Sequence, residues 1–113
     1  MTVTAYYKPL PGQKKYATGS FWHDRRLNGA GVKTSSGKKP RVGTIAADSR
    51  VFTPGTSLYV PGYGLGKVED SGGAIKGRRL DVFMGAGQSA LKKALNWNRR
   101  RVVVFVLGTS IQN

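Results

Sequence analysis

The sequence predicts a mainly-β fold: a small closed barrel with one short helix and a long basic loop. Three observations support this prediction. The chain has 113 residues, a length typical of one domain. Short runs rich in β-branched and aromatic residues recur along it, separated by turns that draw on its 16 glycines. Only one stretch spaces its apolar residues as a helix does.

The first strand is predicted at residues 3–7, Val-Thr-Ala-Tyr-Tyr, and it ends at Pro9 and the turn-forming pair Pro11 and Gly12. Residues 12–43 are polar, basic and rich in glycine. We interpret them as a long ordered loop or a pair of loops, most basic over residues 20–41. Loops of this length in compact domains are often functional.

Beyond residue 43 the pattern changes to short strands punctuated by glycine and proline. Together with residues 3–7 they make about six strands. The others are predicted at residues 44–47, 56–60, 65–68, 80–84 and 101–107. The last of these is almost wholly apolar, which indicates a strand buried on both faces. The tail, residues 108–113, is expected to fray.

The helix is predicted over residues 88–97. Leu91, Ala94 and Leu95 repeat there at helical spacing. Trp97, at the end of this segment, is expected to lie in the core.

The charge of the chain indicates an anionic partner. Lys and Arg total 19 and Asp and Glu total 5, a formal net charge of +14. Nucleic acid, a membrane surface and an anionic cell-wall polymer all fit this charge. No apolar run approaches the ~20 residues of a membrane span, and the N-terminus does not resemble a signal peptide.

The residue inventory excludes several chemistries. The chain has no cysteine and one histidine, His23. Disulfides, thiolate metal sites, a cysteine nucleophile and a multi-histidine metal site are therefore excluded. Acid–base chemistry must draw mainly on the five carboxylates. These are Asp24, Asp48, Glu69, Asp70 and Asp81.

Asp48, Asp70 and Asp81 all lie at or within predicted strands or directly after them. This placement is unusual, because an ionised carboxylate is costly to bury without a partner. Any one of them could simply cap a turn. The three together favour a shared site.

The segments around these aspartates resemble a known family. Gly-Thr-Ile-Ala-Ala-Asp at 43–48 and the stretch 54–64 are similar to the middle of the three-aspartate, or 3D, domain family. Glu-Asp-Ser-Gly-Gly-Ala-Ile-Lys-Gly at 69–77, followed by Arg-Leu-Asp-Val-Phe at 79–83, resembles its most specific signature. The resemblance runs from residue 3 to 107. It implies a six-stranded double-psi β-barrel, similar to the catalytic barrel of membrane-bound lytic transglycosylase A.

The resemblance also implies an activity. Members cleave the β-1,4 bond between N-acetylmuramic acid and N-acetylglucosamine in peptidoglycan and leave a 1,6-anhydro ring. The family's main catalytic acid corresponds to Asp81, its second aspartate to Asp70 and its third to Asp48. No cofactor and no metal are implied. We hypothesise that Asp81 acts first as acid and then as base, and that burial and Asp70 keep it protonated. Asp24 and Glu69 are left without a role.

Further residues are expected to support the site. The predicted substrate contacts are Thr18, Ser71, Gly72, Gly73, Lys76 and Tyr6. Small residues let backbone amides approach a sugar closely. Lys76 fits a solvated loop lysine equally well, and Tyr6 fits a packing role. The sequence departs from the family in Ser71, where threonine is usual, in its longer basic loop, and in lacking a flanking second domain.

Two other functions remain open. One is a non-catalytic barrel that binds cell-wall polysaccharide, since a fold does not fix a function. The other is a nucleic-acid binder, which the basic loop with Phe21 and Trp22 permits. We expect a monomer whose partners are peptidoglycan glycan strands and the anionic cell envelope, with no specific nucleic acid. It would act on the bacterial cell wall, in the periplasm or outside the cell, delivered by a phage or as a trimmed piece of a secreted protein.

Overall fold

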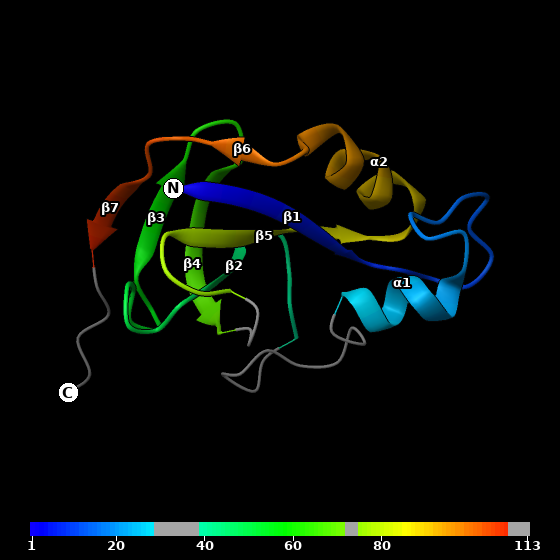
Figure 1. The fold of residues 1–113 in the computed structure, drawn as a ribbon, viewed down its shortest axis with the longest axis horizontal. Helices are drawn as coiled ribbons and strands as arrows, with labels where there is room; N and C mark the ends of the chain where they lie inside the picture. Colours follow the sequence, from blue (N-terminus) through cyan, green and yellow to red (C-terminus); the bar gives the residue numbers. More distant parts are fainter. Residues whose placement is uncertain (29–38, 72–74, 109–113) are drawn as a thin grey trace.

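The computed structural model describes residues 1–28, 39–71 and 75–108. Within them the fold is mainly β, one curled sheet of seven strands with two helices (Figure 1). The strands are β1 (Thr2–Lys8), β2 (Thr44–Ala47), β3 (Ser57–Val60), β4 (Gly64–Asp70), β5 (Arg79–Ala86), β6 (Arg100–Arg101) and β7 (Phe105–Gly108). The helices are α1 (Phe21–Leu27) and α2 (Gly87–Trp97). No helix of the described residues has the length and apolar character needed to cross a membrane.

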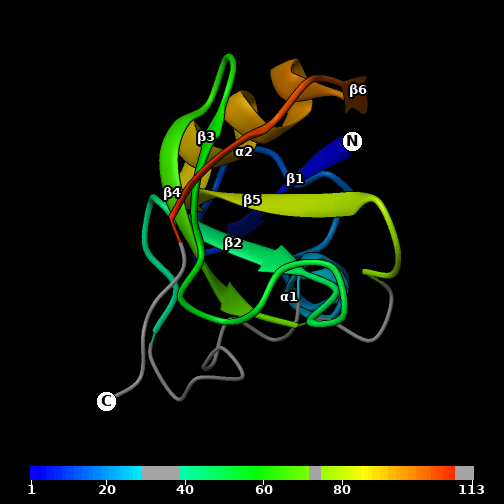
Figure 2. The same ribbon diagram turned by 90° about the vertical axis from the view of Figure 1, so that its left-hand side faces the viewer.

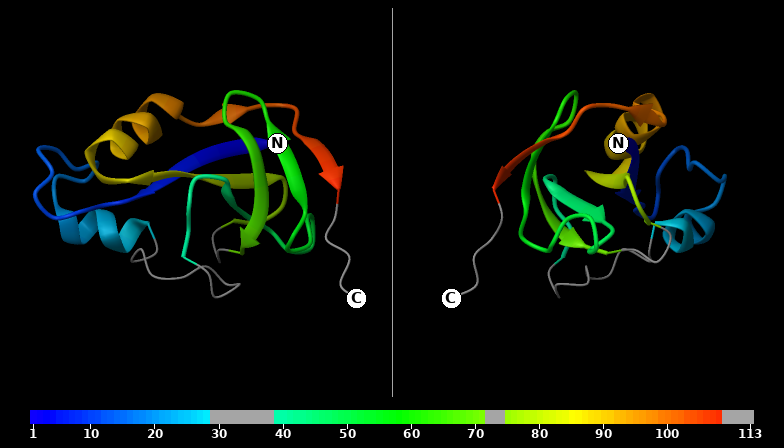
Figure 3. Two further views of the ribbon diagram at one scale, coloured as in Figure 1. Left: turned by 180° about the vertical axis from the view of Figure 1, so that it is seen from behind. Right: turned by 60° about the vertical axis from the view of Figure 1, so that its left-hand side comes forward.

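The sheet has the order β6-β1-β5-β2-β4-β3-β7. Strands β1 and β5 pair in parallel, as do β2 and β4, while β2 and β5 are antiparallel. Views from the side and from behind show the sheet curling round itself like half of a barrel (Figures 2 and 3). The predicted mainly-β, barrel-like fold is confirmed, whereas the double-psi connectivity stays a prediction.

The core fills the inside of this curl. It is built from side chains that alternate along the strands, as a sheet with one buried face requires. Its fully or almost fully buried members are Val3, Ile45, Ala47, Leu58, Val60, Val68, Leu80, Val82 and Trp97. The indole of Trp97 also donates a hydrogen bond to the carbonyl oxygen of Val3, at 3.0 Å. The prediction that Trp97 lies in the core is confirmed.

Helix α2 follows β5 directly and packs on β1 and β5. Ala90 and Leu91 form a second cluster with Tyr7 of β1. Leu95, predicted on the same apolar face, is 44% exposed. The helix ends where Asn98 adopts a φ of 56° and a ψ of −171°, outside the helical region.

The prediction of one buried strand over residues 101–107 is wrong. The run is split between β6, which pairs with β1 at one edge of the sheet, and β7, which pairs with β3 at the other. Val102 and Val104 pack against the core, and Val103 between them is 72% exposed. The chain therefore crosses from edge to edge with one face inward. This crossing accounts for seven strands where about six were predicted.

The prediction of loop throughout residues 12–43 is also wrong, because α1 forms within it. The helix has only seven residues, too few for an apolar repeat to stand out. Residues 29–38 and 109–113, which include much of the predicted basic loop and nearly all of the predicted frayed tail, lie outside the described residues.

Candidate functional site

Two of the three aspartates lie in one row across the sheet. Asp81 of β5 is paired with Thr4 of β1 on one side and with Ala46 of β2 on the other. Ala46 is paired in turn with Asp70 of β4. Directly paired residues share a face of a sheet. Because Ile45 and Ala47 point into the core, this row faces away from it.

Ala46 separates the two carboxylates. Neighbouring strands lie about 4.8 Å apart, so the Asp70 and Asp81 backbones are about 10 Å apart, with one methyl side chain between them. A larger residue at position 46 would occupy that space.

Asp81 is partly buried, and its environment favours the protonated form. Burial raises the pKa of Asp81 to about 6, and the negative charge of Asp70 adds to the rise. A hydrogen bond from the Thr4 hydroxyl, at 3.2 Å, and the positive charge of Arg79 oppose it. Despite a chain charge of +14, this carboxyl can hold a proton near neutral pH.

Tyr6 lies on the same face, two residues along β1 from Thr4. Its ring contacts Phe83, with centroids 5.0 Å apart. Burial raises the pKa of Tyr6, and the charges of Asp70 and Asp81 raise it further, so the hydroxyl stays protonated. Among the described residues this buried hydroxyl has no hydrogen-bond partner.

Asp48 has a different environment. Arg50 donates to it through its backbone N–H and its guanidinium, the latter at 3.0 and 2.8 Å, and the Gly77 N–H donates at 2.9 Å. These bonds hold the pKa of Asp48 well below its usual range. Asp48 thus stays ionised and ties the segment after β2 to the loop before β5. Its contacts are those of a positioning residue.

Of the other predicted substrate contacts, Ser71 lies next to Asp70 in the carboxylate row, whereas Thr18 is bonded to Asp24. The Ser71 N–H donates to Asp70 at 2.9 Å, and the Ser71 and Lys76 side chains are exposed. Gly72 and Gly73 lie outside the described residues. The hydroxyl and N–H of Thr18 both donate to Asp24.

Sequence reasoning missed the role of Asp24. This carboxylate is fully buried and accepts hydrogen bonds from the Tyr7 hydroxyl, from Thr18 and from the Ala17 N–H. The bonds lower the pKa of Asp24 although burial opposes them. Asp24 therefore fastens α1 and the preceding loop to the end of β1. No local pattern in the sequence marked it, because the short helix that carries it shows no apolar repeat.

Glu69, also left without a role, is buried next to Asp70. The Thr44 hydroxyl donates to it at 3.1 Å, and Arg41 forms an ion pair with it at 3.8 Å. Among the described residues, no group of three or more His, Cys, Asp or Glu side chains is placed to hold a metal ion.

Solved structures with a similar fold come from Escherichia coli. The lytic transglycosylase MltA superposes with a TM-score of 0.58 and 29% identity, over 71% of this chain and 28% of MltA. MltA with bound chitohexaose gives a TM-score of 0.55 and 27% identity, over 83% of this chain and 36% of that structure.

Curated relatives come from Bacillus subtilis (strain 168). The cell wall-binding protein YocH is 41% identical over 70 residues, which cover 62% of this chain and 23% of YocH. The putative cell wall shaping protein YabE is 35% identical over 68 residues, 60% of this chain and 16% of YabE. The chain thus spans less than a quarter of the length of either relative. Residues 43–107, more than half of the chain, match the 3D domain family, and the chain belongs to that family.

Proposed function

We propose that this domain is a peptidoglycan lytic transglycosylase that cleaves the β-1,4 bond between N-acetylmuramic acid and N-acetylglucosamine. The observation that carries the proposal is Asp81, a partly buried carboxyl with a pKa near 6 that faces Asp70 across Ala46. Similarity to MltA, a lytic transglycosylase, and to proteins named for cell-wall binding and shaping supports the substrate class.

In the first step, protonated Asp81 donates its proton to the glycosidic oxygen. The C1–O bond breaks, and N-acetylglucosamine leaves with that proton as its new hydroxyl. Positive charge develops at C1 of the muramic sugar. The ionised Asp81 and the nearby Asp70 stabilise this charge electrostatically.

In the second step, the muramic C6 hydroxyl attacks C1 and gives its proton to Asp81. The products are the 1,6-anhydro sugar and the released chain end, and Asp81 is protonated again. No water enters, so one carboxyl used twice suffices, whereas an ordinary glycosidase requires two at a set separation.

The other predicted residues support this chemistry in our proposal. Asp48 positions the loop that leads into β5, through its bond to Gly77. Tyr6 is proposed to contact the sugar from beside the two acids, whose charges act on it. The glycan contacts from the flanking loops are proposed to be Thr18, Ser71, Gly72, Gly73 and Lys76.

A second candidate is a non-catalytic barrel that holds the glycan without cleaving it. The name of YocH, cell wall-binding protein, favours it. In that case the Asp81–Asp70 row would serve to bind sugar hydroxyls.

One digestion separates these functions. Purified peptidoglycan is incubated with the protein, and soluble products are analysed by mass spectrometry. Anhydromuropeptides from the wild type and none from Asp81→Asn are expected. Binding without soluble products would instead support the second candidate, and products with reducing ends would indicate a hydrolase.

A further inference from the structure

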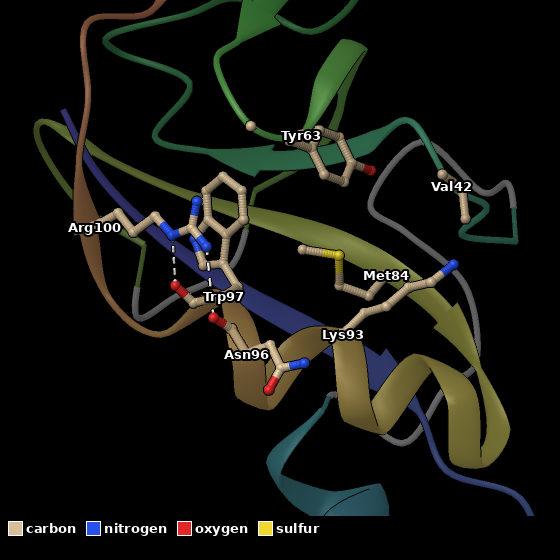
Figure 4. A pocket seen from close by; sticks show the side chains of 8 residues that line it. Val42, Tyr63, Met84, Lys93, Asn96, Trp97 and Arg100 are labelled. Carbon is tan, nitrogen blue, oxygen red and sulfur yellow. Dashed lines mark hydrogen bonds between the residues drawn. The ribbon is translucent and has the colours of Figure 1, made fainter.

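A concave surface lies on the other side of β5 from Asp81. It is a hollow of about 350 Å³ between α2 and the turn that joins β3 to β4 (Figure 4). Its lining residues are Val42, Gly62, Tyr63, Met84, Lys93, Asn96, Trp97 and Arg100. Met84 packs against the core cluster, whereas Asp81 faces away from it, so the hollow is separate from the carboxylate row. A volume of this order suits a small ligand.

Two cations flank the hollow, with Trp97 and Met84 between them (Figure 4). The Arg100 guanidinium stacks 4.1 Å from the Trp97 ring centroid. It also donates to the carbonyl oxygens of Trp97 and Asn96, at 2.7 and 3.4 Å. Arg100 is therefore held in place before any ligand arrives, with further N–H donors to offer.

Lys93 lies one helical turn before Trp97 and stands at the other end of the hollow (Figure 4). Among the described residues, neither Lys93 nor Arg100 forms an ion pair with a carboxylate. Two unpaired positive charges on one small hollow favour an anionic ligand.

The surface between the cations is apolar. It consists of Val42, which is 67% exposed, Met84 and the rings of Tyr63 and Trp97. A ligand that fits this surface needs an aliphatic segment as well as its charges. The side-chain amide of Asn96 at the rim offers a partner for a peptide group.

We propose that this hollow binds a short acidic peptide that carries two carboxylates separated by an aliphatic segment. One carboxylate would contact Arg100 and the other Lys93. If the protein acts on peptidoglycan, as proposed above, the stem peptides of that polymer carry such groups. A polyol phosphate would leave the apolar surface uncovered, so the observations favour the peptide.

The hollow and the carboxylate row are on opposite faces of β5. The peptide bound at the hollow would therefore belong to a different part of the wall from the sugar at Asp81. Such a contact would hold the protein on the polymer.

The test uses the peptide N-acetyl-L-Ala-γ-D-Glu-D-Ala, which has one carboxylate on the glutamate and one at the C-terminus. Binding is followed by NMR chemical-shift titration of the labelled domain at low salt. The two monoamides of the peptide and glycerol 3-phosphate are titrated alongside it. The variants are Lys93→Gln and Arg100→Gln. Their controls, Lys92→Gln and Arg99→Gln, remove the same charge from neighbouring exposed residues that do not line the hollow.

We expect chemical-shift changes centred on the residues of the hollow. The Kd should rise about three- to fivefold in Lys93→Gln, in Arg100→Gln and for each monoamide, because a partly exposed ion pair contributes a free energy of that order. The control variants should bind as the wild type does. Each cation variant should also bind the peptide and one of its two monoamides with the same Kd, because the cation that contacts that carboxylate is missing. A general change in charge would not produce this selectivity.

Absence of binding, equal weakening in all four variants, or tighter binding of glycerol 3-phosphate would each overturn the proposal. Thermal unfolding of every variant checks that Arg100→Gln leaves the Trp97 region folded. The titration contains no glycan, so it is independent of catalysis. If the peptide binds but the peptidoglycan digestion gives no anhydro products, only the proposed function is refuted. If the digestion gives anhydro products but the peptide does not bind, only this inference is refuted.

Discussion

Replacing Asp81 with asparagine should abolish the proposed lytic activity and make the folded protein more stable at neutral pH. Asparagine keeps the shape of the side chain but cannot ionise. Burial raises the pKa of Asp81 from the ordinary value of 3.8 to about 6. A shift of about two pKa units corresponds to a free energy of up to about 3 kcal/mol, at 1.36 kcal/mol per unit.

The sign of this effect follows from where the proton is held more tightly. The folded chain binds it more strongly than the unfolded chain, because the pKa of Asp81 is raised on folding. The free energy of unfolding therefore falls as the pH rises from about 4 to about 6 and does not recover above that. The asparagine side chain has no proton to lose, so the variant lacks this fall.

Urea unfolding of both proteins between pH 4 and pH 7.5 measures the difference. Other carboxylates titrate in both proteins and largely cancel when the two curves are subtracted. The gap should widen by about 2–3 kcal/mol between pH 4 and pH 7 in favour of the variant. Parallel curves would refute the raised pKa. Anhydro products at the wild-type rate would refute the catalytic role, for which a loss of at least about 10²-fold is expected.

Three further substitutions test other parts of the structure. Asp48→Asn should lower the melting temperature at pH 7, because it weakens hydrogen bonds to an ionised carboxylate. The difference in melting temperature between the variant and the wild type should shrink as the pH falls below about 4, and an equal difference at pH 3 and pH 7 would contradict this. Gly66→Ala should cost about 1–3 kcal/mol in urea unfolding, since its Cβ would lie 2.5 Å from Ile45; the control Gly108→Ala, with open space around it, should be neutral. Asp24→Ala should destabilise the protein by about 1–3 kcal/mol and speed hydrogen exchange in α1, because the buried Tyr7 hydroxyl and the N–H groups of Ala17 and Thr18 lose their acceptor; unchanged exchange would show that α1 does not depend on it.

Much of the candidate site was predictable from local sequence. Asp70 and Asp81 stand out because a charged residue at the end of a strand or inside it needs a reason to be there. Their pairing through Ala46 was not predictable, because it depends on which strands become neighbours and in what register.

The missed elements have long-range causes. Helix α1 is too short to show an apolar repeat, and what fastens it is Asp24, a buried charge that accepts a hydrogen bond from Tyr7 of β1. The consecutive valines at 102–104 suit a buried strand locally. Which faces they bury was decided by the two sheet edges they connect.

The parallel pairing of β1 with β5 has a consequence for folding. The Thr4 hydroxyl contacts the carbonyl oxygen of Leu80, 76 residues away, and the adjacent Asp81. Contacts between such distant segments form slowly and late. Until β1 is in place, Asp81 is an ordinary, solvated aspartate with an ordinary acidity. The acid that we propose to cut the wall therefore becomes chemically competent only when β1 has paired with β5, so a chain in which these strands are still apart would be inactive.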